Sequence, residues 1–177
     1  MDPPTRKLIM LLAFSLAIIY SASSASAESK LIHKVCSKTD DYRSCVAALH
    51  LDPRAARAAT LFSLSEIALR AAAKDAARSR KHVDRMLADP NTQSSWKPVL
   101  ETCKGHLNTA AGQFLMASRE LMTDTMSANY DVRMAWDEIE ACLEFMRSRE
   151  QNIPPLITRC AHAKTQVSIG LVVTNEY

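Results

Sequence analysis

Apolar residues recur along most of the chain at spacings of three and four, the periodicity of α-helices that bury one face. The pattern occupies four long stretches, 54–88, 96–121, 131–147 and 156–175. The positions expected to face inward are Leu61, Leu64, Ala68, Ala72, Ala76, Ser79, Val83 and Met86; Trp96, Leu100, Cys103, Leu107, Ala110, Phe114, Ala117 and Leu121; Val132, Ala135, Ile139, Cys142 and Met146; and Cys160, Ala163, Val167 and Leu171. Because short breaks separate the stretches, the pattern predicts an all-α, antiparallel up-down-up-down four-helix bundle.

The breaks in the pattern set the expected helix boundaries. Asp52-Pro53 resembles a helix cap followed by proline at the first helical position, so the first long helix is predicted from 54. Residues 123–130 interrupt the periodicity and are predicted to form a loop. Residues 148–155 are predicted to form a second loop, because Pro154-Pro155 cannot continue a preceding helix.

Before the first long stretch, Cys36 and Cys45 bracket eight mostly polar residues, with short apolar clusters on both sides. This predicts two short helices that turn at Thr39-Asp40 and are joined by a disulfide. A helix of about ten residues is marginal alone, and a disulfide restricts its unfolded chain. We expect residues 28–51 to be an outlying hairpin with an exposed disulfide, appended to the bundle of residues 52–175.

Residues 1–27 have the pattern of a secretory signal peptide. Arg6 and Lys7 precede thirteen mostly apolar residues, and Ala25-Ser26-Ala27 is a suitable cleavage site. The apolar run is shorter than the ~20 residues that a membrane span needs. The expected product is a single domain, 28–177, that is secreted and has no membrane association after cleavage.

Composition narrows the classes of function. The chain carries a net charge of +3, and residues 28–177 carry +2, because two basic residues and one acidic residue fall in 1–27. This near balance gives no case for nucleic-acid binding. Only three glycines are present, so no glycine-rich phosphate-binding loop is available. Asp137, Glu140 and Glu144 share one helix face that points outward, which indicates a solvated stripe rather than a catalytic pair.

All five cysteines follow the signal segment, in a compartment where disulfides form. Cys36 and Cys45 are close in sequence, and Cys103 and Cys142 lie on inward positions of consecutive helices. Of the possible disulfide pairings, these two therefore require the least special geometry. Cys160 then remains as a free thiol. Cys103 and Cys160 have histidines three and two positions later, but zinc needs thiolates, and Cys103 is better used in a disulfide. No metal site or cofactor is expected.

Basic residues recur on one side of the first long stretch: Arg70, Lys74, Arg78 and Lys81. Nearby acidic residues allow ordinary pairing within the helix, which is the simpler interpretation. The alternative is that this basic stripe meets an acidic surface of a partner molecule.

Several short motifs suggest a family. They are Cys36 and Cys45 with Thr39, Asp41-Tyr42 and Leu49…Asp52-Pro53; Leu100-x-x-Cys103; Trp136…Cys142; and Pro154-Pro155-Leu156 before Ile169-Gly170-Leu171. In these features, and across residues 30–175, the chain resembles the plant inhibitors of invertase and of pectin methylesterase. The resemblance implies a four-helix bundle with an N-terminal helical hairpin, disulfides Cys36–Cys45 and Cys103–Cys142, and a free fifth cysteine.

The chain also departs from the family pattern. His106 stands where a tyrosine is frequent, and 122–130 lacks the Pro-Lys-Phe tripeptide that many invertase inhibitors carry. The expected function is therefore steric inhibition of a cell-wall carbohydrate-active enzyme in a 1:1 complex, with pectin methylesterase favoured slightly over acid invertase, and with no catalysis by the chain itself. The resemblance places the esterase contact on outward residues of the bundle helices and the invertase contact on the segment around 125–130. The expected contact residues are the basic stripe, which would meet an acidic surface of the enzyme or polyanionic pectin, and Thr125, Met126, Ser127, Asn129 and Tyr130. The expected location is the extracellular space of the cell wall (the apoplast), with the vacuole as another destination.

A function of another class is a secreted helical module that binds pectin or lipid without any enzyme target. Lipid carriage would need an exchangeable apolar cavity. The alanine-rich inward positions favour tightly closed helices instead.

Overall fold

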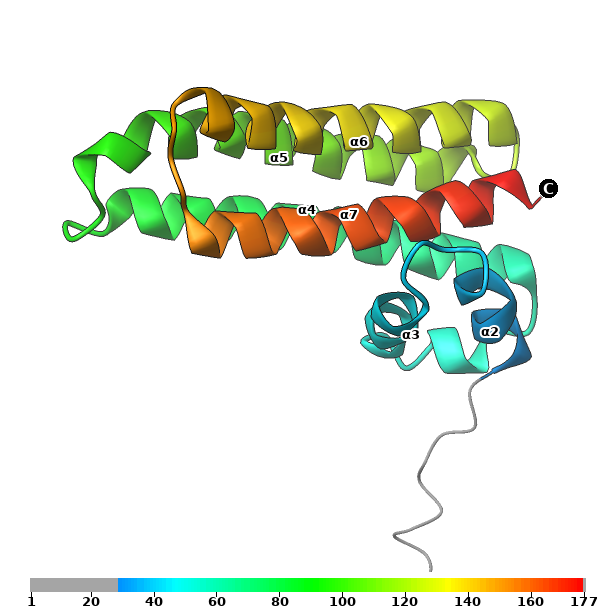
Figure 1. The fold of residues 1–177 in the computed structure, drawn as a ribbon. Helices are drawn as coiled ribbons and strands as arrows, with labels where there is room; N and C mark the ends of the chain where they lie inside the picture. The colour runs from blue at the N-terminus through cyan, green and yellow to red at the C-terminus, as the bar shows by residue number, and fades with distance from the viewer. Residues whose placement is uncertain (1–28, 177) are drawn as a thin grey trace, which may run out of the picture.

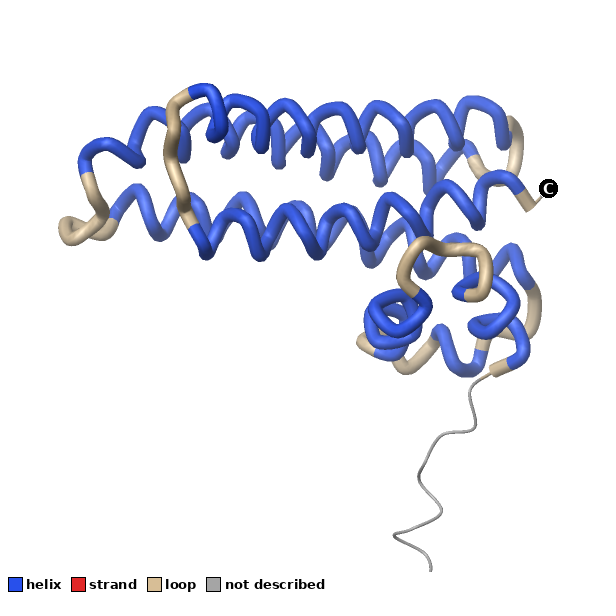
Figure 2. Tube along the Cα trace, viewed as in Figure 1, coloured by secondary structure: helices blue, strands red, loops and turns tan. Residues whose placement is uncertain are grey.

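The computed structural model describes residues 29–176, and all regular structure in that range is helical (Figures 1 and 2). The elements are α2 (Lys30–Cys36), α3 (Tyr42–His50), the short 3-10 helix η1 (Ala55–Arg57), α4 (Leu61–Ala88), the 3-10 helix η2 (Ser94–Trp96), α5 (Lys97–Glu120), α6 (Thr125–Ser148) and α7 (Pro154–Asn175). The all-α prediction is confirmed. The predicted signal peptide, 1–27, lies outside the described residues and stays a prediction.

The four long helices form the predicted antiparallel bundle. In Figure 1 the chain direction alternates from α4 to α7. Each helix packs against the next one in sequence, and α7 returns to α4, which closes the ring. Phe114, Leu100, Leu107 and Ile139 are among the large side chains buried at its centre.

Most of the predicted inward positions are buried, but Leu61, Met86 and Trp96, at or near helix ends, are half-buried. Leu171 is half-buried, whereas Ile169, Gly170 and Val173 on the same helix are fully or almost fully buried. The reason is that α7 packs against α4, α6 and the hairpin helices α2 and α3 together. A helix covered on several sides buries a wider stripe than one repeat of three and four positions indicates.

The predicted start of α4 is wrong by seven residues. The helix begins at Leu61, and the Thr60 hydroxyl caps it by accepting a hydrogen bond of 3.1 Å from the Ser63 amide. The Thr60 amide in turn donates a hydrogen bond to Ser63 Oγ, which completes the capping box. Asp52 instead binds the Arg54 side chain, which holds the pKa of the Asp52 carboxyl at about 2.

The predicted loop 123–130 is also wrong, because α6 begins at Thr125. Asp124 caps the helix: its carboxylate accepts hydrogen bonds from the Ser127 amide at 3.0 Å and the Ser127 hydroxyl at 2.7 Å. The second predicted loop is shorter than expected, because Pro154 and Pro155 occupy the first turn of α7. The missing amide hydrogens of proline cost little there.

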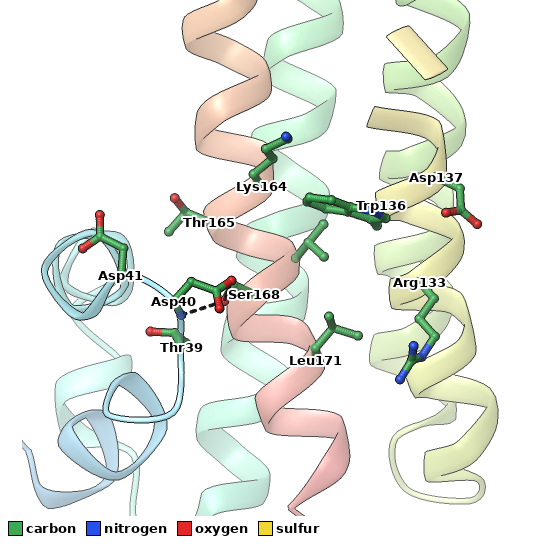
Figure 3. Close-up of a pocket in the computed structure, with 11 residues that line it drawn as sticks. Thr39, Asp40, Asp41, Arg133, Trp136, Asp137, Lys164, Thr165, Ser168 and Leu171 are labelled. Carbon is green, nitrogen blue, oxygen red and sulfur yellow. Dashed lines mark hydrogen bonds between the residues drawn. The ribbon is translucent and has the colours of Figure 1, made fainter. Parts of the chain in front are cut away.

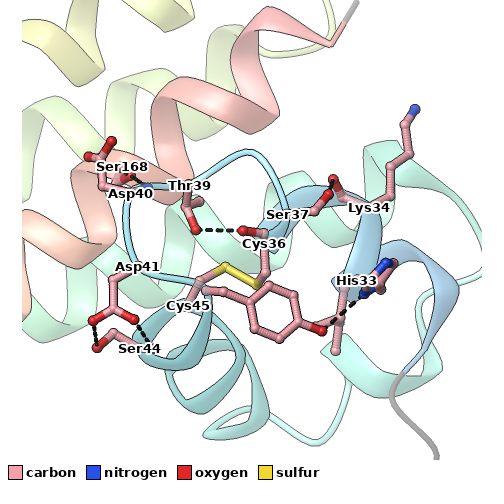
Figure 4. Close-up of a disulfide and its surroundings, with 12 residues drawn as sticks. His33, Lys34, Cys36, Ser37, Thr39, Asp40, Asp41, Ser44, Cys45 and Ser168 are labelled. Carbon is pink, nitrogen blue, oxygen red and sulfur yellow. Dashed lines mark hydrogen bonds between the residues drawn. A yellow bond between two sulfur atoms is a disulfide. The ribbon is translucent and has the colours of Figure 1, made fainter.

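The hairpin of α2 and α3 is not outlying. The side chains of Ile32, Val35, Cys36 and Cys45 are 4% exposed or less and belong to the common core. The Cys36–Cys45 disulfide joins α2 to α3 inside this contact (Figure 4). The expectation of an exposed disulfide is therefore wrong, because the apolar side of both short helices is covered by α7 and α4.

Polar contacts fix the hairpin to the end of α7. The ammonium of Lys34 lies 3.0 Å from the Glu176 carboxylate, and Lys38 pairs with the same carboxylate. Hydrogen bonds from Lys38 and then Lys34 lower the pKa of Glu176. At the turn, the Asp40 amide donates to Ser168 Oγ at 3.4 Å. The first and last elements of the described chain are thus joined directly.

Gly170 marks a close approach of three helices. A Cβ atom at this position would lie 2.9 Å from Val132 Cγ1 and 3.5 Å from Leu69 Cδ2. We expect Gly170→Ala to destabilise the protein by about 1–3 kcal/mol, because the branched, buried Val132 must move. Gly105→Ala is the matched control, since nothing lies within 4 Å of its added Cβ, and it should stabilise α5 by about 0.5–1 kcal/mol. Urea denaturation of both variants tests this, and equal effects would contradict it.

Candidate functional site

Three large apolar side chains lie exposed at the junction of α5 and α6. Met122 is 78% exposed, Met126 83% and Tyr130 62%. Met126 and Tyr130 are four positions apart in α6, so they lie on the same outer side of this helix, and Met122 lies in the turn before the helix. We call Met122, Met126 and Tyr130 the apolar stripe. Single exposed apolar residues are common, but a group of them at one end of a helix indicates a binding surface.

The apolar stripe is presented by a firmly anchored helix. Asp124 caps the first turn, and the hydrogen bonds from Ser127 lower the pKa of this aspartate. On the opposite side, Ala128 and Val132 are fully buried. Asn129 Nδ2 donates to Thr174 Oγ1 at 2.7 Å, which ties α6 to α7. The start of α6 therefore holds its exposed side chains on a defined backbone.

The structure separates the predicted contact residues on α6 by role. Met126 and Tyr130 are exposed, whereas Thr125, Ser127 and Asn129 are half-buried. Ser127 belongs to the helix cap and Asn129 to the contact with α7. Met122 was not among the predicted residues. The sequence signal that could have indicated it is its place two residues before the capping aspartate, Asp124, in a short connection between two helices.

The basic stripe lies on another side of the bundle. Arg70, Lys74, Arg78 and Lys81 are exposed on α4. Arg70 pairs with Glu66 at 2.9 Å, while the other three make no ion pair among the described residues. The ring of packed helices runs α4, α5, α6, α7, so α4 and α6 stand on its diagonal. One flat partner surface cannot cover the basic stripe and the apolar stripe together.

A groove lies between α6, α7 and the turn of the hairpin (Figure 3). Its volume is about 620 Å³, and Trp136, Arg133, Lys164 and Ser168 are among the residues that line it. Trp136 is 37% exposed, and the Lys164 ammonium lies 4.9 Å from the centroid of its ring. Residues from three separated segments form this groove, so no local sequence pattern indicates it.

The outward carboxylates of α6 do not form a catalytic pair. Asp137 and Glu144 are exposed. Glu140 is half-buried, and its two carboxylate oxygens lie 2.5 Å from Lys164 Nζ and 3.5 Å from the Arg147 guanidinium. Such ion pairs are consistent with the predicted solvated stripe and supply no group poised for proton transfer.

Asp131 is a buried carboxyl group that the sequence analysis did not single out. It is 7% exposed, and its burial, together with the neighbouring charge of Glu120, raises its pKa to about 6. A hydrogen bond with the Glu120 side chain, which requires one of the two carboxyl groups to be protonated, also raises the pKa of Asp131. Asp131 lies four positions before the inward residue Ala135, and this helical spacing could have indicated its burial.

The raised pKa of Asp131 makes the stability depend on pH. Between pH values of about 4 and 6, the folded protein holds a proton that the unfolded chain has released, so the free energy of unfolding falls as the pH rises through this window. Asparagine does not ionise. At a pH of about 7.5, we expect Asp131→Asn to be more stable than the parent by about 1–2 kcal/mol.

At a pH of about 3 most of this gain should disappear, because Asp131 is then largely protonated in the unfolded as well as the folded state. Urea denaturation at the two pH values measures the difference. Asp137→Asn, which changes an exposed aspartate on the same helix, should show no such dependence. A gain in the Asp131 variant that is equal at both pH values would contradict the assignment.

The sulfur atoms of three cysteines meet in the bundle core. The Cys103–Cys142 disulfide links α5 to α6, and the Sγ of the free Cys160 lies 3.8 Å from the Sγ of Cys142. Burial raises the pKa of the Cys160 thiol to about 11, so the thiol is neutral and unreactive near neutral pH. Across residues 29–176, no cluster of three or more metal-ligating side chains is present.

The comparisons with known proteins decide the family. The model of the family described as plant invertase/pectin methylesterase inhibitor matches residues 30–171. The chain belongs to this inhibitor family. No curated protein matches the chain significantly in sequence.

Two solved structures of inhibitors share the fold of this family member. One is a mutant form of a pectin methylesterase inhibitor from Arabidopsis, with 22% identity and a TM-score of 0.70, covering 84% of this chain and 97% of its own. The other is a pectin methylesterase inhibitor from Arabidopsis thaliana, with 21% identity, a TM-score of 0.59, and coverage of 82% and 94%. The predicted resemblance and the helical-bundle fold are confirmed.

The family covers inhibitors of two kinds of enzyme, invertases and pectin methylesterases. Membership places the chain among inhibitor proteins rather than in a catalytic family. In residues 29–176, no helix is both long enough and apolar enough to span a membrane.

Proposed function

We propose that this protein is a secreted inhibitor of pectin methylesterase that binds one enzyme molecule and blocks its substrate cleft. The observation that carries the proposal is the apolar stripe on the capped start of α6. Membership of the inhibitor family supports the class of function. The absence of a Pro-Lys-Phe tripeptide from 122–130 favours the esterase over invertase.

The proposed mechanism is steric and needs no catalytic group or cofactor. Tyrosine and methionine are enriched at the centres of protein interfaces, where they fill pockets of the partner. The cap at Asp124 and the Asn129–Thr174 hydrogen bond hold the helix in one shape before binding. A preformed surface loses less conformational entropy on docking than a flexible loop, and the difference contributes to affinity.

Acid invertase is the alternative target. Its contact was expected on residues 125–130, and the outer side of the bundle helices was expected for the esterase. Because 125–130 forms the first turns of α6, this segment is itself part of the outer side of a bundle helix. The apolar stripe suits either enzyme, so the preference for the esterase rests on the missing tripeptide and is tested by experiment.

The test is a parallel inhibition titration of a plant pectin methylesterase and a plant acid invertase at mildly acidic pH. The proposal expects stoichiometric loss of esterase activity, with the invertase unaffected at the same inhibitor concentration. Inhibition of the invertase alone would transfer the function to the alternative. Inhibition of neither enzyme at micromolar excess would overturn both.

A further inference from the structure

The groove beside α7 has the dimensions of a small-ligand site. Its volume of about 620 Å³ lies within the range of pockets that hold small molecules. One wall is α6 with Arg133 and Trp136, and the other wall is α7 with Ser168, joined by the hairpin turn at Thr39 and Asp40 (Figure 3). The groove is open to solvent along its length, so an extended chain could enter it without any movement of the helices.

The indole of Trp136 provides an apolar platform within the groove. Figure 3 shows the ring lying from α6 toward α7. The Lys164 ammonium holds it at 4.9 Å, and this ammonium is in turn neutralised by Glu140 at 2.5 Å. The half-exposed ring is therefore fixed in position, and the apolar face of a sugar ring can pack on its open part.

Three carboxylates line the groove, and two of them are engaged within the protein. Asp41 accepts both the amide and the hydroxyl of Ser44, as the cap of α3. Asp40 Oδ2 accepts the Ser168 hydroxyl at 3.3 Å. Asp137 is exposed. Because all three charges repel an anion, a ligand carboxylate is favoured in this groove only beside a cation.

Arg133 is the cation that remains available. Its Nε donates to Asn129 Oδ1 at 3.0 Å, which orients the guanidinium, and among the described residues it makes no ion pair with a carboxylate. An oriented guanidinium binds a carboxylate through two parallel hydrogen bonds. On the opposite wall, the hydroxyl oxygens of Thr39, Thr165 and Ser168 can accept hydrogen bonds from sugar hydroxyls.

We propose that this groove binds a short uronic-acid oligosaccharide with free carboxylates, whose sugar ring packs on Trp136 while its carboxylate binds Arg133. This is a second binding activity, separate from enzyme inhibition through the apolar stripe. Its ligand class is the acidic, de-esterified polysaccharide of a cell wall. An inhibitor with this site is retained where free carboxylates are dense.

Trp136 itself can report the binding. The chain has two tryptophans, so Trp96→Phe leaves Trp136 as the single indole fluorophore. Trigalacturonate should change its fluorescence saturably, the methyl-esterified trisaccharide should bind at least tenfold more weakly, and neutral galactotriose should not bind. Calorimetry on the unchanged protein repeats the titration without relying on the Trp96 variant.

Two variants locate the site. Arg133→Gln should weaken trigalacturonate binding at least tenfold, and Lys81→Gln, which removes an exposed cation from α4, should leave it unchanged. Equal weakening by both variants, binding that ignores methyl esterification, or no binding at all would overturn the proposal. Arg133→Gln should still inhibit the esterase fully, so failure of this site is distinguishable from failure of the proposed inhibition.

Discussion

Replacement of Met126 and Tyr130 together by alanine should weaken inhibition of the target enzyme at least a hundredfold. Both side chains are mostly exposed in the free protein, so their truncation should leave the fold intact. In a complex the same side chains would be buried, and central interface residues of this kind cost about 2–4 kcal/mol each when truncated. The measurement is the inhibition constant, with thermal unfolding to show that stability is unchanged.

Leu51→Ala is the matched control for this experiment. Leu51 is 82% exposed, as exposed as Met126, but it lies at the end of α3 in the hairpin. Its truncation should not alter the inhibition constant. If Leu51→Ala weakened inhibition as strongly as the double variant, or if the double variant still inhibited fully, the apolar stripe would not be the contact surface.

Loss of the core disulfide should produce the largest change in stability. Cys103 and Cys142 are separated by 39 residues, and the bond between them removes chain entropy worth about 4 kcal/mol from the unfolded state. Domains of this size are stable by about 5–15 kcal/mol. The variant Cys103→Ala/Cys142→Ala should therefore be close to unfolding at moderate temperature, which denaturant titration measures directly.

Comparison with the hairpin disulfide tests the reason for this loss. Cys36 and Cys45 are separated by nine residues, so the same entropic argument gives about 3 kcal/mol for Cys36→Ala/Cys45→Ala. Both variants should be made in a Cys160→Ala background, because unfolding exposes the Cys160 thiol, which could then exchange with whichever disulfide remains. A greater loss from the hairpin pair would contradict loop length as the cause, and burial could not explain it, because all four cysteines are fully buried.

The helical class and most of the core could be predicted because inward positions repeat regularly within each helix. The start of α6 could not be predicted from this repeat. Met122, Met126 and Tyr130 are apolar but face outward, so they disturbed the repeat and gave the impression of a loop. The capping motif Asp124-x-x-Ser127 is the feature of the sequence that does indicate a helix start at this point. The residues that broke the pattern are those now proposed to bind a partner.

The predicted start of α4 was wrong for a different reason. Asp52-Pro53 has the composition of a helix start, but the Asp52 carboxylate binds Arg54 and the cap forms at Thr60 instead. Asp52-Pro53 and Thr60 are both possible helix starts. Burial of Ala55 favours the short 3-10 helix η1 between them, so α4 begins only after Thr60. The groove was beyond prediction altogether, because its walls come from the hairpin turn, α6 and α7.

The docking of the hairpin on α7 also governs the order in which the molecule can fold. Lys38 and its partner Glu176 are 138 residues apart, and Asp40 and Ser168 are 128 apart. During synthesis, α2 and α3 are made first but cannot dock until α7 has been synthesised. The apolar side chains of Ile32 and Val35 stay uncovered until then. Such delayed long-range pairing slows folding and exposes intermediates to aggregation. The Cys36–Cys45 disulfide joins residues that are close in sequence, so it can form early and hold α2 and α3 together until α7 is available.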